Sequence, residues 1–126
     1  MPEKFASPLV GVRVIELGSL IAGPFAGRIL ADFGAEVIKV ENPTSSDPMR
    51  EWGKVRVKGR ALWWAIQSRG KKSIAVDIKS AEGRMIIEAL IEHADVLVEN
   101  YRPGTLEKLG LAPDRLWELN PGLVIA

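Results

Sequence analysis

Residues 9–43, LVGVRVIELGSLIAGPFAGRILADFGAEVIKVENP, decide the fold class of this chain. Two runs rich in Val and Ile, at 12–17 and 37–40, have the composition and length of strands. Between them, residues 25–33 repeat apolar side chains at helical spacing, and Gly34 can end that helix in a left-handed conformation. A strand, a helix and a strand in so few residues predict a βαβ unit with parallel strands and a right-handed crossover.

The same alternation continues along the rest of the chain. The predicted strands are 73–78, 95–99 and 123–126, and the predicted helices are 81–93, 105–109 and 113–119. Ser80 and Thr105 have hydroxyl groups that suit the caps of the helices beside them. Strands of nearly continuous Val and Ile, separated by helices, predict an α/β fold in which helices cover both faces of a parallel sheet.

Two segments stand apart from this alternation. Residues 44–60 are polar and rich in cations, and we expect a long excursion loop, which in a compact domain tends to be functional. Residues 61–67, ALWWAIQ, fit either a short helix or a packed loop, and Trp63 and Trp64 are expected to anchor a core or a subunit interface. Residues 1–8 are expected to form a flexible lead, which leaves 9–126 as the folded domain.

Composition narrows the class of protein. The 126 residues are 47% hydrophobic and 26% charged, as in a globular protein, and the net charge of +1 gives no reason to expect nucleic acid. The chain has no cysteine and one histidine, His93, so we expect no metal site. It shows neither a signal-peptide pattern nor an apolar run of the roughly 20 residues that span a bilayer. We therefore expect a cytoplasmic protein with no membrane partner.

Three predicted loops follow strands at their carboxyl ends, where parallel sheets bind ligands. They are residues 18–24, Lys79 with its neighbours, and residues 100–104. Backbone N–H groups at helix starts, together with Lys79, Arg102 and Lys108, suit phosphate groups. Tyr101 adds an aromatic face for a base or a thin acyl chain. The alternative, that each cation is only solvated surface, stays open.

Several familiar catalytic patterns are missing from the sequence. Residues 18–23, GSLIAG, are not the G-x-G-x-x-G dinucleotide fingerprint, so Glu41 is only a weak signal for a ribose and a nicotinamide-dependent oxidoreductase is disfavoured. There is no P-loop, no nucleophilic cysteine and no serine elbow, and His93 at the end of its helix is expected to be structural. We therefore assign no catalytic residue within the chain.

Four blocks of sequence resemble the class III CoA-transferase family, also called the CaiB/BaiF family. They are GVRVIEL, AGPFA and LADFGAEVIKVENP within 11–43, KKSIAVDIKSAEG at 71–83, ADVLVENYRPGTLEKLG at 94–110 and LNPGLVIA at 119–126. Formyl-CoA transferase, carnitine CoA-transferase and α-methylacyl-CoA racemase are similar in this region. The resemblance implies a Rossmann-like α/β large domain, joined to a small domain, in a dimer whose two chains interlink. Residues 9–126 would be the N-terminal part of that CoA-binding domain, with an incomplete sheet.

The resemblance also implies which residues contact coenzyme A. Ile21 and Ala22 would line the CoA, and Val76, Asp77 and Lys79 would meet its nucleotide end; Asn100, Tyr101 and Arg102 would border the pantetheine and diphosphate, and Lys108 would stand at a phosphate. Family members often carry an arginine near the adenine directly after the residue matching Glu41. Here that position is Asn42, which puts this nucleotide contact in doubt.

The implied activity is the transfer of CoA between carboxylic acids through an aspartyl-CoA thioester, with an acyl-CoA and a carboxylic acid acceptor as substrates. The family's nucleophilic aspartate, and the His/Asp pair of its racemases, lie beyond residue 126. We therefore expect this chain alone to be inactive, and a homodimer or a complementing C-terminal fragment to be its partner. The alternatives are a fragment of an acyl-CoA racemase and a non-catalytic CoA-binding module.

Overall fold

The computed structural model describes residues 7–126, so most of the expected lead at 1–8 lies outside the described residues. Its main sheet contains the strands β1 (Arg13–Leu17), β2 (Glu36–Glu41), β5 (Lys71–Ala75), β6 (Val96–Glu99) and β7 (Val124–Ile125). The helices are α1 (Ala22–Asp32), α2 (Leu62–Gln67), α3 (Ala81–Ile91), α4 (Thr105–Lys108) and α5 (Pro113–Leu119). A 3-10 helix η1 (Pro48–Glu51) and a small hairpin of β3 (Arg56–Val57) and β4 (Arg60–Ala61) lie between β2 and α2.

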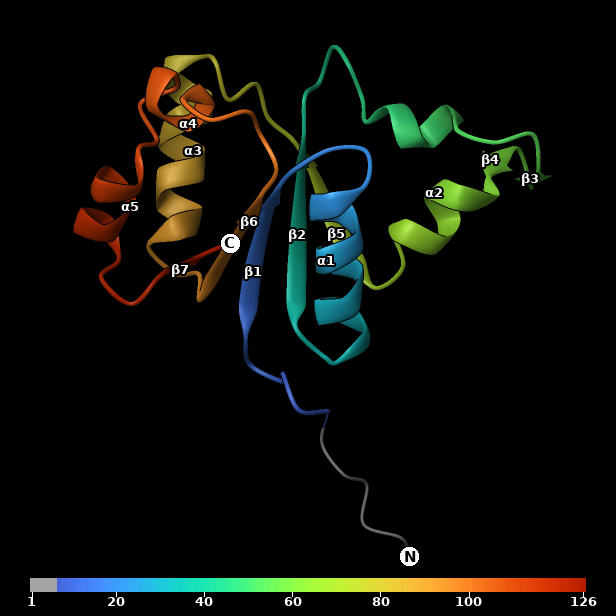
Figure 1. Cartoon of the computed structure of the whole chain (residues 1–126), viewed down its shortest axis with the longest axis horizontal. Coiled ribbons are helices and arrows are strands. Elements are labelled where there is room, and N and C mark those ends of the chain that lie inside the picture. Colours follow the sequence, from blue (N-terminus) through green and yellow to red (C-terminus); the bar gives the residue numbers. More distant parts are fainter. Residues whose placement is uncertain (1–6) are drawn as a thin grey trace, which may run out of the picture.

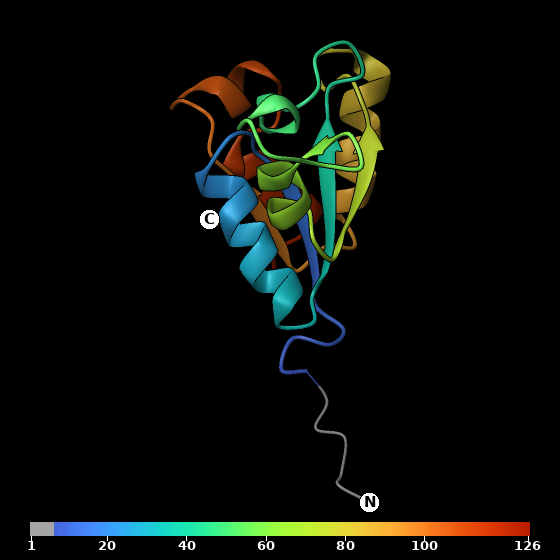
Figure 2. The ribbon, with the colours of Figure 1, turned by 90° about the vertical axis from the view of Figure 1, so that its right-hand side faces the viewer.

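Helices cover both faces of the parallel sheet, as the sequence predicts (Figure 1). On one face, Val14, Val37 and Val98 pack with apolar side chains of α1. On the other face, Ile15 and Leu97 belong to a larger core with buried residues of α3, α4 and α5. Side chains of successive strand residues point to opposite faces, so strands of nearly continuous Val and Ile supply both cores. Figure 2 shows α1 running beside the sheet in a view turned by 90°.

The strand order β5-β2-β1-β6-β7 is that of a Rossmann-like fold. The chain builds outward from β1 through β2 to β5, and the segment containing α3 then carries it to the other side of β1, where β6 and β7 follow. β5 and β6 are thus parallel strands of one sheet but are not neighbours. The loops that leave β1 and β6 diverge at this switch point, which is where open α/β sheets bind ligands.

Some predicted boundaries are wrong, for identifiable reasons. α1 begins at Ala22 rather than at residue 25, because the first turn of a helix accepts Pro24 without losing a hydrogen bond. β5 ends at Ala75, so Asp77 lies in a turn outside the strand, where its Oδ1 accepts a hydrogen bond from the Lys79 N–H at 3.0 Å.

One further detail of local structure differs from the sequence prediction. Thr105 is the first residue of α4 rather than its cap, a position held by Gly104 at φ 81°. Residues 44–60 are the expected excursion between β2 and α2, and they also contain η1, β3 and the first residue of β4. The cap at Ser80 is confirmed, because its hydroxyl accepts a hydrogen bond from the Gly83 N–H at 2.9 Å. The segment 61–67 supplies the short helix α2.

Candidate functional site

A pocket of about 400 Å³ opens at the carboxyl ends of the central strands. The lining comes from the end of β2, from the loops after β1, β2, β5 and β6, and from both ends of α4: Gly18, Ser19, Lys39, Val40, Glu41, Asn42, Ser45, Ser46, Asp47, Pro48, Ile78, Lys79, Tyr101, Thr105 and Leu109. Its volume is in the range of ordinary small-molecule sites. The pocket therefore lies where the topology of the sheet predicts a ligand.

The loop between β1 and α1, residues 18–21, is held by side chains from elsewhere in the chain. Asn100, directly after β6, accepts a hydrogen bond from the Ser19 N–H at 3.1 Å and donates one to the Ser19 carbonyl at 2.9 Å. Gly18 is required for this contact, because a Cβ there would collide with the Asn100 side-chain oxygen. The Asn100 side chain thus links the loop after β6 to the loop after β1 through two hydrogen bonds.

Four charged side chains form a buried cluster on the sheet face that α1 covers. Lys39 Nζ lies 3.0 Å from Glu16 Oε1 and 2.9 Å from Asp47 Oδ2, and Lys71 Nζ lies 2.6 Å from Glu16 Oε2. All four side chains are at most 2% exposed. Burial lowers the pKa of Lys71, although Glu16 acts in the opposite direction. The two lysines and two carboxylates sum to zero net charge, and pairing of this kind offsets the free-energy cost of burying each charge.

Sequence reasoning missed this cluster, although a signal was present. Glu16 and Lys39 each interrupt an otherwise apolar strand, and a buried strand accepts a charge only when a partner neutralises it. The two residues are register partners, since Glu16 of β1 lies opposite Lys39 of β2. Two members of the cluster, Lys39 and Asp47, also line the pocket.

Two of the nine predicted CoA contacts, Lys79 and Tyr101, line the pocket directly. The Lys79 side chain is exposed, whereas burial raises the pKa of the half-buried Tyr101. Val76 is buried and continues the β5–β2 ladder, since its N–H donates to the Glu41 carbonyl at 2.8 Å. Asp77 supports the turn that carries Lys79, and Asn100 acts through the loop it fastens.

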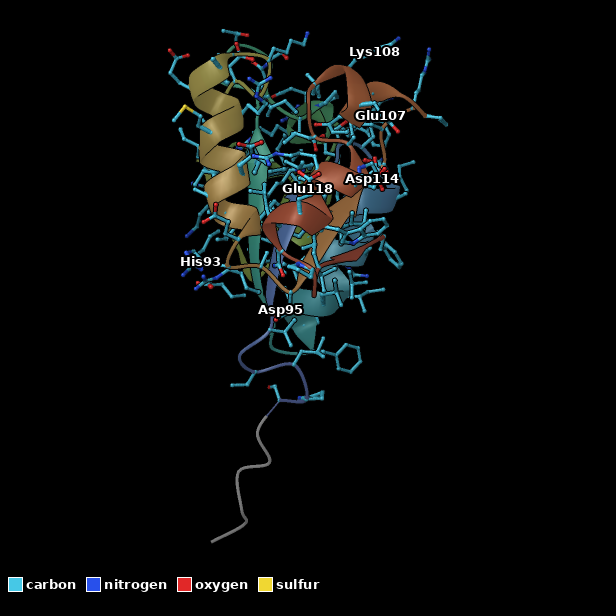
Figure 3. The ribbon with its side chains drawn as sticks, turned by 90° about the vertical axis from the view of Figure 1, so that its left-hand side faces the viewer. His93, Asp95, Glu107, Lys108, Asp114 and Glu118 are labelled. Carbon is cyan, nitrogen blue, oxygen red and sulfur yellow. The ribbon has the colours of Figure 1, made fainter. Side chains whose placement is uncertain are left out.

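The other four predicted residues lie around the pocket rather than in its lining. Ile21, 56% exposed, and Ala22 lie at the start of α1. Arg102 borders a separate cavity of about 80 Å³. Lys108 on α4 points away from the body of the molecule, and His93 lies at the opposite end of the molecule, beyond α3 (Figure 3). His93 is therefore far from the pocket edge.

The arrangement can hold an anionic molecule with a flat or apolar part. Lys79 supplies an ammonium group, Ser45, Ser46 and Thr105 supply hydroxyl groups, and Tyr101 supplies an aromatic surface. Among residues 7–126, no group of three or more acidic or histidine side chains is placed to hold a metal ion. In the same described part of the chain, no helix is long and apolar enough to cross a membrane.

The strand order and the helices on both faces of the sheet define a Rossmann-like α/β domain. The model of the family described as CoA-transferase family III matches residues 9–126, and the chain belongs to this family. The chain is 57% identical over 118 residues to a succinyl-CoA–D-citramalate CoA-transferase from Chloroflexus aurantiacus, covering 94% of this chain and 29% of that protein. It is 45% identical over 130 residues to a succinate–glutarate CoA-transferase from Agrobacterium fabrum, covering 98% of this chain and 32% of that protein.

Solved structures agree with this assignment. A CAIB/BAIF family protein from Brucella suis superposes with a TM-score of 0.87 at 41% identity. The match covers 95% of this chain and 32% of the Brucella suis chain. A hypothetical protein (Rv3272) from Mycobacterium tuberculosis gives a TM-score of 0.85 at 42% identity, with the same coverage. The chain thus spans about a third of the length of its relatives, and the Rossmann-like fold inferred from the sequence is confirmed.

Proposed function

We propose that this chain is the N-terminal, coenzyme A-binding part of a class III acyl-CoA transferase, which moves CoA between carboxylic acids through an aspartyl-CoA thioester. The observation that carries the proposal is the match of the family to residues 9–126, which include every strand of the sheet and every loop around the pocket. Membership of a transferase family supports the proposed activity, and the pocket at the switch point supports a role for this part of the protein in binding the substrate.

The pocket suits the nucleotide end of CoA. We propose that Lys79, which lines the pocket, meets a phosphate and that the ring of Tyr101 contacts the base or the pantetheine. The first turn of α1, with Ile21 and Ala22, presents backbone N–H groups beside the same edge. Asn42 stands where family members often carry an arginine. Its side-chain oxygen accepts hydrogen bonds from residues 44 and 45 and so shapes the wall of the pocket.

We propose that Arg102 and Lys108 act on the outer part of the coenzyme. Both are exposed on the segment that follows β6, so their charges can reach a phosphate without a buried partner. A longer ligand that leaves the pocket along this segment would meet them in turn. Solvent-exposed cations contribute modestly to affinity, and each contact of this kind weakens as salt concentration rises.

The substrates are proposed to be dicarboxylic acids. The relatives are named for CoA transfer between succinyl-CoA and D-citramalate or L-malate, and between succinate and glutarate. Succinate, glutarate, D-citramalate and L-malate are all acids with two carboxyl groups. Succinyl-CoA is therefore the first donor to test. We infer that the aspartate nucleophile comes from sequence outside residues 1–126, so that turnover requires a C-terminal fragment that carries this aspartate. We propose a cytoplasmic location for the protein.

Calorimetric titration of the purified chain with CoA, and separately with NAD, tests the binding role. We expect heat and saturation with CoA and none with NAD. A chain that is folded by circular dichroism but does not bind CoA would contradict the proposal.

Incubation of the chain with succinyl-CoA and D-citramalate, followed by chromatography of the CoA esters, tests the catalytic part separately. We expect no transfer by this chain alone. Transfer by the chain alone would refute the inference that the nucleophile lies outside residues 1–126, but it would agree with the proposed transferase activity.

A further inference from the structure

Asp47 is buried although the residues around it are not. Residues 43–46 and Pro48 are exposed, whereas Asp47 is 5% exposed. Its Oδ1 accepts hydrogen bonds from the Met49 N–H at 2.9 Å and from the Leu20 N–H at 3.3 Å. An isolated carboxylate would be costly in such a place, so the surrounding partners must compensate for its lost hydration.

Lys39 supplies that compensation and contacts the same loop. Its ammonium group lies 2.9 Å from Asp47 Oδ2 and donates a hydrogen bond to the Gly18 carbonyl at 2.7 Å. Lys39 therefore contacts the first residue of the segment 18–20 and Asp47 contacts the last, and the two side chains form an ion pair with each other. Lys39 is anchored in turn by Glu16, so the support of the loop reaches into the middle of the sheet.

Leu20 has an unfavourable backbone conformation for a residue other than glycine, with φ 68°. Such a conformation persists only where the surroundings hold it, and functional loops are a common place for it. Apolar residues often replace a buried ion pair without loss of stability, so stability alone does not require charges here. A defined shape of residues 18–21, directly before α1 and beside the pocket, does require fixed polar contacts.

We propose that Asp47, together with Lys39, is a positioning residue that holds the loop 18–21 in the shape needed to bind coenzyme A. The ligand assignment rests on the proposed function, whereas the hold on the loop rests on the contacts alone. Neither side chain needs to touch the coenzyme for this role. Without Asp47, Leu20 is expected to relax toward ordinary φ values and to move the start of α1 away from its binding geometry.

Two substitutions of Asp47 separate the hydrogen bond from the charge. Asp47→Ala removes the acceptor for the Leu20 N–H, whereas Asp47→Asn keeps an acceptor oxygen and loses the charge. Asp114→Asn, on the exposed first turn of α5, is the matched control. We expect the calorimetric Kd for CoA to rise about tenfold in Asp47→Ala, to rise about threefold or less in Asp47→Asn and to stay unchanged in the control.

Amide hydrogen exchange on the same proteins reports on the loop without any ligand. We expect the Leu20 amide of Asp47→Ala to exchange faster than that of the control, while core amides of β1 keep their protection. The exchange measurement tests whether Asp47 stabilises the loop even if the wild-type chain does not bind CoA. Failure of the wild-type chain to bind CoA would contradict the proposed function and not the contact between Asp47 and the loop. Unchanged exchange at Leu20 in a folded Asp47→Ala protein overturns the positioning role, as does an unchanged Kd.

A second pair of variants covers the case in which Asp47→Ala does not fold. Leu20→Gly removes the backbone strain, and Lys58→Gly does the same at φ 49° in the distant β3–β4 hairpin. Both should fold, because glycine accepts these conformations freely. We expect only Leu20→Gly to weaken CoA binding, by about threefold or more, since its loop loses a fixed shape. Equal affinity of the two variants for CoA overturns the inference.

Discussion

Gly27 lies in the middle of α1, where alanine would ordinarily stabilise the protein. The structure predicts the reverse for Gly27→Ala. A Cβ at this position would lie 3.0 Å from Glu16 Cδ and 3.2 Å from Lys71 Nζ, and it would overlap Glu16 Oε2. The helix therefore packs against the buried charge cluster through a position that has no room for a methyl group.

The size of the effect follows from two opposing contributions. Replacing glycine by alanine inside a helix is worth about 1 kcal/mol of added stability. Against it, the methyl group displaces Glu16 from Lys71, a contact of 2.6 Å between buried side chains. A hydrogen bond to a charged group contributes about 1.5–3 kcal/mol, and breaking a buried pair costs about 3–5 kcal/mol. We expect a net loss of about 2 kcal/mol in the free energy of unfolding.

Urea unfolding followed by the fluorescence of the four tryptophans measures this loss. Ala89→Gly is the control, because Ala89 is exposed inside α3, a helix as long as α1, and reports the propensity contribution alone at about 1 kcal/mol. A Gly27→Ala protein as stable as the wild type, or more stable, would refute the proposed packing of α1 on the cluster.

Three further predictions test other parts of the structure. The Asn120 side chain donates hydrogen bonds of 2.9 and 2.7 Å to two backbone carbonyls at and after the end of α3, so Asn120→Ala should lower the free energy of unfolding by about 2 kcal/mol in urea. A hydrogen bond from Lys72 is the largest of the effects that lower the pKa of Glu36 from 4.5 to about 2. The Glu36 contribution to stability is therefore present above pH 4.5 and lost toward pH 2, so the stability gap between wild type and Glu36→Gln should close over that range; a constant gap would contradict the ion pair. Lys79→Ala should raise the Kd for CoA about fivefold, unlike Lys54→Ala in the distant loop, and equal effects would remove Lys79 from the site.

The fold could be predicted from the sequence because its signals are local. The Val and Ile runs mark the strands, Ser80 marks a helix start, and the family blocks fix their order. The boundaries near Pro24 and Asp77 were less predictable. A proline is compatible with both a loop and a first helical turn, and the run of apolar residues continues past the point where β5 stops pairing.

The candidate site was predicted only in outline. The three loops at one edge follow from parallel strands, but their internal contacts do not. Asp47 meets Leu20 across 27 residues of sequence, and Lys71 meets Glu16 across 55. Such pairs depend on which strands are neighbours and on the side-chain faces they share, which a single sequence does not specify. The role of Asn100 likewise becomes visible only when β6 is placed beside β1.

Titration of the ¹⁵N-labelled chain with CoA, followed by amide chemical shifts, tests the central claim most directly. If this chain is the coenzyme-binding part of a class III CoA-transferase, saturable shifts should concentrate in residues 18–24, 76–79 and 100–108. NAD should leave these amides unchanged. Saturable shifts confined to the β3–β4 hairpin, or no shifts with CoA in a folded chain, would contradict the account.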